Sequence, residues 1–201
     1  MQDERQEKIS SIEALHKEIS FCRACDLHLK RTQPVPGSGS PDAKIMFVGE
    51  APGKDEDIRG LPFVGAAGKF LSELLTIIDL KREDVFIANV LKCRPPDNRD
   101  PQEEETKKCW PFLERQFDII NPQLIVLLGR HAMYRFLPES FKISLCHGRA
   151  FEKEGKVYFP VYHPAMALYK RENREVLIKD FLKIPALLKT VSAPSREKSL
   201  I

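Results

Sequence analysis

The sequence predicts an α/β fold, a three-layer α/β/α sandwich with a mostly parallel central sheet of about four strands. Three observations predict it. Short apolar segments alternate with longer amphipathic ones, as in sheets whose crossovers are helices. The segment Leu124–Leu128 is apolar without interruption, as expected of a strand buried on both faces. The chemically distinctive segments follow strand candidates, where such sheets bind ligands.

The strand candidates are the segments that combine apolar, β-branched and aromatic residues. They cover residues 44–48, 85–90, 124–128 and 157–162. The residues 152–156, around Gly155, are typical of a hairpin turn before the last strand. The segment 32–42 is rich in Pro, Gly and Ser and is predicted to be a loop.

Helical spacing of apolar residues predicts helices over 3–20 and 66–78. A third helix is expected to begin at Asp100, because Asp100 and Glu103 fit a capping box with Pro101 at the first helical position. A last amphipathic helix is predicted over about 174–188, interrupted near Pro185.

Length and composition indicate one globular domain. The 201 residues are 42% hydrophobic and 30% charged, and we expect a single domain over 1–190 followed by a flexible tail over 191–201. No apolar run approaches the roughly 20 residues that cross a bilayer, and the polar start argues against a secretory signal. We therefore expect a cytoplasmic protein without a membrane partner. The net charge of +3 is compatible with nucleic acid but does not indicate it.

Four of the five cysteines are predicted to form one metal site. Cys22 and Cys25 make a Cys-x-x-Cys pair, whereas Cys93 and Cys109 lie far downstream. In a reducing compartment such a set suits a metal better than disulfides. Four thiolates satisfy zinc and an iron–sulfur cluster equally, so the residues leave both open. Either would tie the N-terminal helix to the domain, and Cys146 is left as a buried thiol.

Polar features follow three of the strand candidates. The segment Gly-Glu-Ala-Pro-Gly at 49–53 follows the first, Asn89 lies late in the second, and His163-Pro164 follows the last. The carboxyl ends of parallel strands meet at one edge of a sheet. We therefore expect these features to converge on one site.

These motifs resemble the family 4 uracil-DNA glycosylases, the iron–sulfur branch of the uracil-DNA glycosylase superfamily. The resemblance covers the chain from Cys22 to about Leu188. It rests on an ordered set of motifs: Cys-x-x-Cys, GEAPG, PFVG at 62–65, Asn89, KCRPP at 92–96, Cys109 and HPA at 163–165.

The resemblance implies a monofunctional uracil-DNA glycosylase that hydrolyses the N-glycosidic bond of uracil in single- and double-stranded DNA. The product is an abasic site, which initiates base-excision repair. It also implies that the four cysteines hold a [4Fe–4S] cluster, with zinc the lesser alternative, and we expect this cluster to be structural. The expected partner is uracil-containing DNA. The protein is expected to be a monomer that needs no other protein.

The resemblance also implies a role for each pocket residue. Phe63 would stack on the extruded base, and Asn89 would read it through its amide. His163 would donate a hydrogen bond to uracil O2, where negative charge grows as the bond breaks. Glu50 would stabilise the sugar or orient water, and the backbone N–H groups of Glu50 and Ala51 would touch the base. The plainer alternatives are a core Phe, a loop-bonding Asn and a structural His.

The chain departs from the family 1 branch at two positions. Ala51 stands where family 1 has a water-activating Asp, and Gly53 stands where a Tyr excludes thymine. We expect the 55–57 loop to contribute to thymine exclusion instead. The missing Asp keeps alive a second hypothesis, a non-catalytic module that binds uracil or abasic DNA. A third is a zinc-stapled protein that binds another nucleotide.

Contacts with DNA are predicted after His163. Met166 or Leu168 would wedge into the duplex, and Lys170 and Arg171 would grip phosphates together with Arg94. The alternative is that the segment 170–174 is only a solvated helix start.

Overall fold

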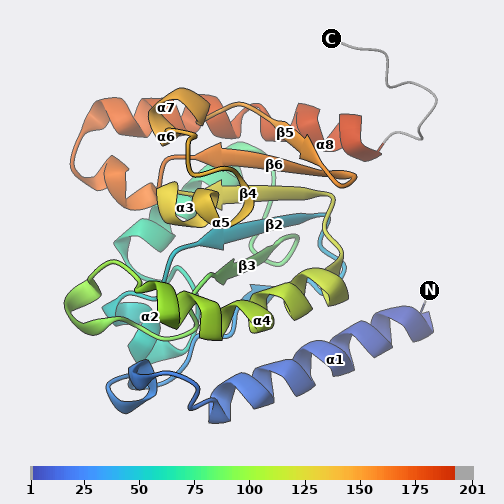
Figure 1. The fold of residues 1–201 in the computed structure, drawn as a ribbon. Coiled ribbons are helices and arrows are strands. Elements are labelled where there is room, and N and C mark those ends of the chain that lie inside the picture. The colour runs from blue at the N-terminus through green and yellow to red at the C-terminus, as the bar shows by residue number, and fades with distance from the viewer. Residues whose placement is uncertain (1, 193–201) are drawn as a thin grey trace.

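The computed structural model describes residues 2–192. Its centre is one sheet with the strand order β1-β3-β2-β4-β6-β5, covered by helices on both faces (Figure 1). The predicted three-layer α/β/α sandwich is confirmed. The strands are β1 (Ser38–Gly39), β2 (Ile45–Gly49), β3 (Phe86–Asn89), β4 (Leu124–Leu128), β5 (Phe151–Lys153) and β6 (Lys156–Val161).

The four inner strands are those that the sequence predicted. β2 pairs in parallel with both β3 and β4, and β4 pairs in parallel with β6. Two edge strands add to the predicted count of about four. β1 pairs antiparallel with β3, and β5 forms the antiparallel hairpin with β6. These edge strands have two and three residues, too few to show an alternating pattern in sequence.

Eight α-helices and three short 3₁₀ helices occur in the described residues. The α-helices are α1 (Gln2–Phe21), α2 (Lys54–Arg59), α3 (Ala66–Ile77), α4 (Glu103–Ile120), α5 (Arg130–Phe136), α6 (Ile143–Cys146), α7 (Arg171–Phe181) and α8 (Ile184–Ser192). The 3₁₀ helices are η1 (Asp26–Leu29), η2 (Pro96–Asn98) and η3 (Pro164–Leu168).

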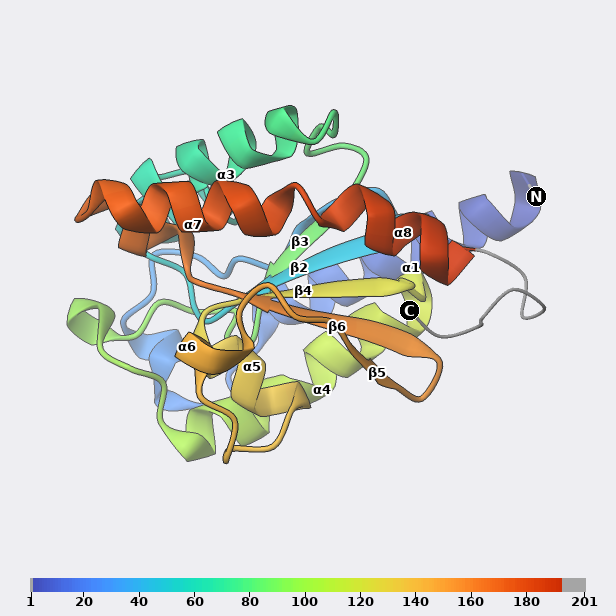
Figure 2. The same cartoon turned by 90° about the horizontal axis from the view of Figure 1, so that it is seen from above.

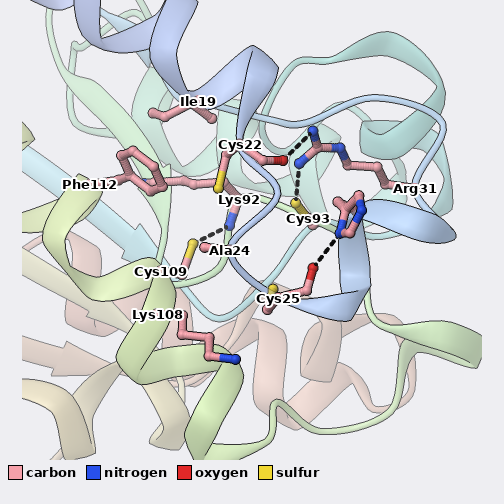
Figure 3. A pocket seen from close by; sticks show the side chains of 11 residues that line it. Ile19, Cys22, Ala24, Cys25, Arg31, Lys92, Cys93, Lys108, Cys109 and Phe112 are labelled. Atoms are coloured by element: carbon pink, nitrogen blue, oxygen red, sulfur yellow. Dashed lines mark hydrogen bonds between the residues drawn. The ribbon is translucent and has the colours of Figure 1, made fainter.

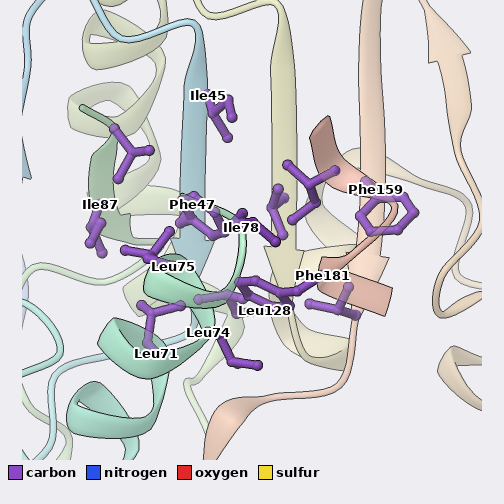
Figure 4. Close-up of a cluster of buried hydrophobic side chains, with 14 of the residues drawn as sticks. Ile45, Phe47, Leu71, Leu74, Leu75, Ile78, Ile87, Leu128, Phe159 and Phe181 are labelled. Atoms are coloured by element: carbon purple, nitrogen blue, oxygen red, sulfur yellow. The ribbon is translucent and has the colours of Figure 1, made fainter. Parts of the chain in front are cut away.

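Helices α3, α7 and α8 cover one face of the sheet (Figure 2). Alternate residues of the inner strands point to this face, among them Phe47 from β2 and Phe159 from β6. Leu71, Leu74 and Phe181 meet them from the helices (Figure 4). The rings of Phe47 and Phe181 stack with centroids 5.8 Å apart. This side of the core holds α3 and α7 beside the carboxyl ends of the strands.

Helices α1, α4, α5 and α6 cover the opposite face (Figure 2). Met46 and Val48 point to it from β2, and they share a buried cluster with Ile12 of α1 and Leu113 of α4. The side chain of Arg115 in α4 also bonds Glu18 of α1 at 2.6 Å. Packing therefore joins α1 to the domain independently of the cysteines.

Helix α4 begins two residues later than predicted. Its N-cap is Gln102, whose backbone N–H donates to Oε2 of Glu105 at 2.9 Å. Asp100, the predicted cap, instead accepts a hydrogen bond from Arg130 at 3.0 Å. The Asp100 carboxylate, which the local pattern assigned to capping, thus forms a tertiary ion pair instead.

The predicted last helix is two helices. α7 ends at Phe181 and α8 begins at Ile184, so the interruption lies just before Pro185 as expected. Residues 191 and 192 were predicted to belong to the flexible tail, but they are part of α8. Residues 193–201 lie outside the described part of the chain. Among residues 2–192, none of the helices has the length and apolarity that a bilayer crossing requires.

Candidate active site and metal centre

The carboxyl ends of the parallel strands bring the predicted pocket residues together. Glu50 directly follows β2, Asn89 ends β3, and His163 lies just beyond β6. Gly49 and Asn89 are register partners. The sheet order places β4, and with it Gly129, between β2 and β6. The expected convergence on one sheet edge is confirmed.

Asn89, Phe63 and His163 surround one spot beside Gly49. A Cβ on Gly49 would lie 2.3 Å from Oδ1 of Asn89 and 2.6 Å from Cζ of Phe63, so only glycine fits there. The rings of Phe63 and His163 have centroids 5.7 Å apart. The Phe63 ring, the Asn89 amide and the His163 imidazole therefore lie close together.

Phe63 lies in a strained and braced turn. Its φ of 52° falls in the left-handed region, which non-glycine residues seldom adopt. Arg82 donates to its carbonyl oxygen at 3.0 Å, and Gly68 allows α3 to pass directly under that carbonyl. The ring belongs to the α3–α7 core cluster and is 6% exposed, so the core interpretation of Phe63 holds alongside its place beside His163.

Asn89 carries an unmet hydrogen-bonding group. The residue is 2% exposed, and its Oδ1 accepts no hydrogen bond from any described residue. A buried polar atom without a partner costs about 1–3 kcal/mol. The backbone around it is fully tied, because Val90 donates to the Gly49 carbonyl at 2.9 Å and Leu91 to the Glu50 carbonyl at 3.0 Å. The amide oxygen of Asn89 is thus free to accept a hydrogen bond from a ligand.

His163 is held as a neutral imidazole. Its Nδ1 accepts a hydrogen bond from the backbone N–H of Ala165 at 3.2 Å, which assigns the ring proton to Nε2. The pKa of His163 is lowered to about 4, mainly by burial; nearby Glu56 opposes the shift, and nearby His131 contributes to it. At neutral pH the ring is therefore an uncharged Nε2–H donor.

Two partly buried histidines predict acid sensitivity. Burial also lowers the pKa of His16 to about 4, with Lys92 acting in the same direction. Both folded values lie below the unfolded value of about 6.5, so the unfolded chain binds more protons at lower pH. As pH drops from 6.5 to 4, we expect the free energy of unfolding to fall by about 3 kcal/mol through His163 and by less through the more exposed His16.

Urea unfolding at neutral and acidic pH checks this expectation. His16→Leu should remove one share of the pH dependence and leave stability at pH 7 nearly unchanged. A variant with the same pH profile as the wild type would contradict the assignment.

Glu50 lies in a network of charged side chains at the edge of the site. Its Oε2 is 3.8 Å from Nε2 of His131, and that nitrogen is 3.3 Å from Oδ2 of Asp100. Burial raises the pKa of Glu50 and Asp100 adds to this, whereas His131 and Arg130 lower it. Sequence reasoning missed His131. It follows the β4 strand, so the strand-end rule that found the other residues would also have found it.

Glu56 was expected only as part of a 55–57 loop that helps to exclude thymine. These residues instead lie in helix α2, and sequence reasoning missed the contacts of the Glu56 carboxylate. Its Oε1 accepts from the backbone N–H groups of Val64 at 2.8 Å and Gly65 at 2.9 Å, and its Oε2 from Gly53 at 3.1 Å. One carboxylate thus ties the loop after β2 to the turn of Phe63. The spacing from Gly53 to Glu56 matches an N-cap and its third helical position, which is the signal available in sequence.

The four predicted metal-binding cysteines line one pocket at the end of α1 (Figure 3). None of the four forms a disulfide within the described residues. Arg31 donates to Sγ of Cys93 at 2.9 Å, and the backbone N–H of Lys92 donates to Sγ of Cys109 at 3.2 Å. Burial raises the pKa of the Cys93 thiol and raises that of Cys109 to about 12. Thiolates in this pocket therefore need a bound cation, and the all-sulfur set with two N–H donors fits a thiolate-bound metal group.

Residues 36–184 match the sequence model of the uracil DNA glycosylase superfamily. The chain belongs to this superfamily. It is 50% identical to a type-4 uracil-DNA glycosylase of Archaeoglobus fulgidus, over 89% of this chain and 94% of the relative. It is 49% identical to one of Sulfurisphaera tokodaii, over 89% and 86% of the two chains. A type-4 enzyme of Thermotoga maritima is 43% identical over 89% and 95%.

The superfamily match contains every pocket residue but only half of the cysteine set. Glu50, Phe63, Asn89 and His163 lie inside the matched range. Cys22 and Cys25 precede it, so the superfamily match alone says nothing about the metal centre.

Four of the five residues predicted to touch DNA follow His163 closely in the chain, whereas Arg94 follows Cys93. Met166 and Leu168 belong to η3, directly after His163, and are 39% and 50% exposed. Lys170 caps α7, and Arg171 begins it, 3.6 Å from Glu175. Arg94 is half-buried and donates to Oδ1 of Asn98 at 2.8 Å. Met166 and Leu168 are thus exposed directly after His163, and contact of all five residues with DNA stays a prediction.

Proposed function

We propose that this protein is a uracil-DNA glycosylase that hydrolyses the bond between uracil and deoxyribose. The observation that carries the proposal is the unpartnered Oδ1 of buried Asn89, beside the ring of Phe63 and the neutral imidazole of His163. Membership of the superfamily and the printed activity of the type-4 relatives support it.

Asn89 selects the base, and Phe63 stacks on it. The amide of Asn89 offers an acceptor to uracil N3–H and a donor to uracil O4, whereas cytosine presents the reverse pattern. A cytosine would leave buried polar groups unpaired, at about 1–3 kcal/mol each. Phe63 stacks on any extruded base and so contributes affinity without selectivity.

His163 and Glu50 act on the bond. As the bond from C1′ to N1 breaks, its electron pair passes to the uracil ring and charge collects on O2. The Nε2–H of His163 donates to that oxygen, which stabilises the leaving anion. Water adds to C1′ and loses its proton toward Glu50, whose pKa burial raises. No described amine takes part, so we expect no strand cleavage.

The segment after His163 binds the DNA. Met166 or Leu168 fills the space left by the extruded nucleotide, and Lys170, Arg171 and Arg94 neutralise phosphates. Uracil-containing DNA is therefore the expected macromolecular partner. A monomer that needs no other protein stays a prediction, as does the single-domain organisation, which the packing of α1 on α4 supports.

The cysteines hold a [4Fe–4S] cluster. Tetrahedral zinc with Zn–S bonds of about 2.3 Å needs sulfur atoms within about 4 Å of one another. Among residues 2–192, one group of three potential metal ligands has its ligand atoms within 4.8 Å of one another, and it consists of Glu50, Asp100 and His131. No three of the cysteine sulfur atoms in these residues are that close together. The wider spacing of the cysteines favours a larger group than a single ion. Bound there, it would join α1 to α4 and order the 94–99 loop.

The activity is tested on single- and double-stranded oligonucleotides that carry uracil, thymine or cytosine. We expect abasic product from uracil alone. Asn89→Asp should lower the selectivity for uracil over cytosine by at least about tenfold, because the carboxylate loses the amide donor.

Unchanged selectivity in Asn89→Asp would refute the base-reading role. Binding of uracil DNA by the wild type without any abasic product would instead favour a non-catalytic binding module, which the Ala51 substitution keeps open.

A further inference from the structure

Lys92 is a buried lysine that the proposed reaction does not use. It is 1% exposed, and its Nζ donates to the Asn89 carbonyl oxygen at 2.8 Å and to Oε1 of Gln116 at 2.7 Å. Burying an ammonium group destabilises the fold unless the group is hydrogen-bonded, so the fold depends on these two contacts. The side chain thus joins the end of β3 to helix α4.

The backbone of the same residue makes two further connections. Its N–H donates to Sγ of Cys109, and its carbonyl accepts from Val35 at 2.7 Å. Gln116 extends the chain of bonds by donating to the Pro36 carbonyl at 2.8 Å. Lys92 lies beside the predicted metal-binding cysteines (Figure 3), and its hydrogen bond to the Asn89 carbonyl connects it to β3.

The Asn89 side chain depends on its backbone for position. Its Oδ1 has no hydrogen bond within residues 2–192, and the carbonyl of the same residue is the atom that Lys92 holds. Base reading needs the amide placed to within about 0.5 Å. A shift at the end of β3 would therefore misplace the amide without any change in the pocket's composition.

We infer that Lys92 is a positioning residue that fixes the base-reading Asn89 to the metal-binding cysteine loop. The inference rests on the proposed function. It implies that the metal centre affects recognition of uracil, because the cysteine loop and Asn89 are both hydrogen-bonded to Lys92. Lys92 itself touches neither the base nor the sugar.

A double-mutant cycle with single-turnover kinetics tests this role. Lys92→Met, in the metal-loaded protein at saturating enzyme concentration, should excise uracil about tenfold more slowly. In an Asn89→Ala background the same change should cost less than about twofold, because the group that it positions is gone. Affinity for a duplex with an abasic-site analogue should stay within about twofold, since that ligand has no base to read.

Lys156 supplies a matched control. Its Nζ also bonds one amide oxygen, Oδ1 of Asn121, and one carbonyl, that of Pro122, but it lies at the start of β6. Lys156→Met should leave excision and binding unchanged. A merely structural role for Lys92 would reduce the active fraction, whereas the rate constant at saturation would not change.

Several results would overturn the inference. These are an unchanged rate in Lys92→Met, or an equal loss in the wild-type and Asn89→Ala backgrounds. If Lys92→Met does not fold or load iron, Gln116→Met decides, because it leaves Lys92 and the cysteines in place. It should slow excision about threefold, and an unchanged rate refutes the inference. A wild type without any excision would refute the proposed function instead.

Discussion

Replacing His163 with alanine should reduce uracil excision by about 10²–10³-fold at saturating enzyme. The neutral ring has its Nδ1 occupied by the Ala165 N–H, so Nε2–H is the donor left for the base. Loss of a fixed donor toward developing charge removes stabilisation of the transition state, with little effect on ground-state binding. Single-turnover rates and the affinity for an abasic-site duplex measure the two separately.

Two further variants sharpen the result. His163→Gln keeps an N–H donor and should recover part of the lost rate. His147→Ala removes a neighbouring imidazole whose ring lies 4.4 Å from that of Tyr162, and it should cost less than about threefold. Near wild-type excision by His163→Ala would end the assignment of His163 as the donor to the leaving base.

Replacing Cys109 with serine should remove the bound metal group and destabilise the fold. The buried thiol has its pKa raised to about 12, so only a bound cation keeps it as a thiolate ligand. We expect the iron and sulfide content to fall sharply. The free energy of unfolding should fall by about 3 kcal/mol or more, and the Tm should fall by about 10 °C. Metal analysis and thermal unfolding measure the two effects.

Cys146 provides the control for this experiment. Cys146 and Cys109 are equally buried, each 8% exposed, but Cys146 lies in α6, which packs against β6, and it does not line the metal pocket. Cys146→Ser should retain full iron content. Full iron in Cys109→Ser would contradict its role as a ligand, and zinc in place of iron in the wild type would contradict the cluster.

Local sequence patterns were sufficient to predict the four inner strands and the edge of the sheet at which the pocket residues meet. Leu124–Leu128 is apolar throughout because helices cover both faces of the strand, a constraint that leaves a direct trace in sequence. Parallel strands also bring their carboxyl ends to one edge, so Glu50, Asn89 and His163 could be placed together before any coordinates.

The same patterns failed where a tertiary contact competed with a local one. Asp100 fitted a helix cap, but Arg130, distant in sequence, binds its carboxylate, and Gln102 caps α4 instead. The edge strands β1 and β5 are too short to show periodicity and exist because a neighbouring strand offers hydrogen bonds.

The sequence by itself determined the strand–helix alternation, the superfamily motifs and the set of side chains able to recognise a pyrimidine. The tertiary structure decided how those side chains are held: the proton on Nε2 of His163, the carboxylate of Glu56 across two loops, and the bonds of Lys92 to Asn89 and Gln116. The physical reason is range. Periodicity and capping record neighbours within a few residues, whereas burial and hydrogen bonding join groups that only the folded chain brings together.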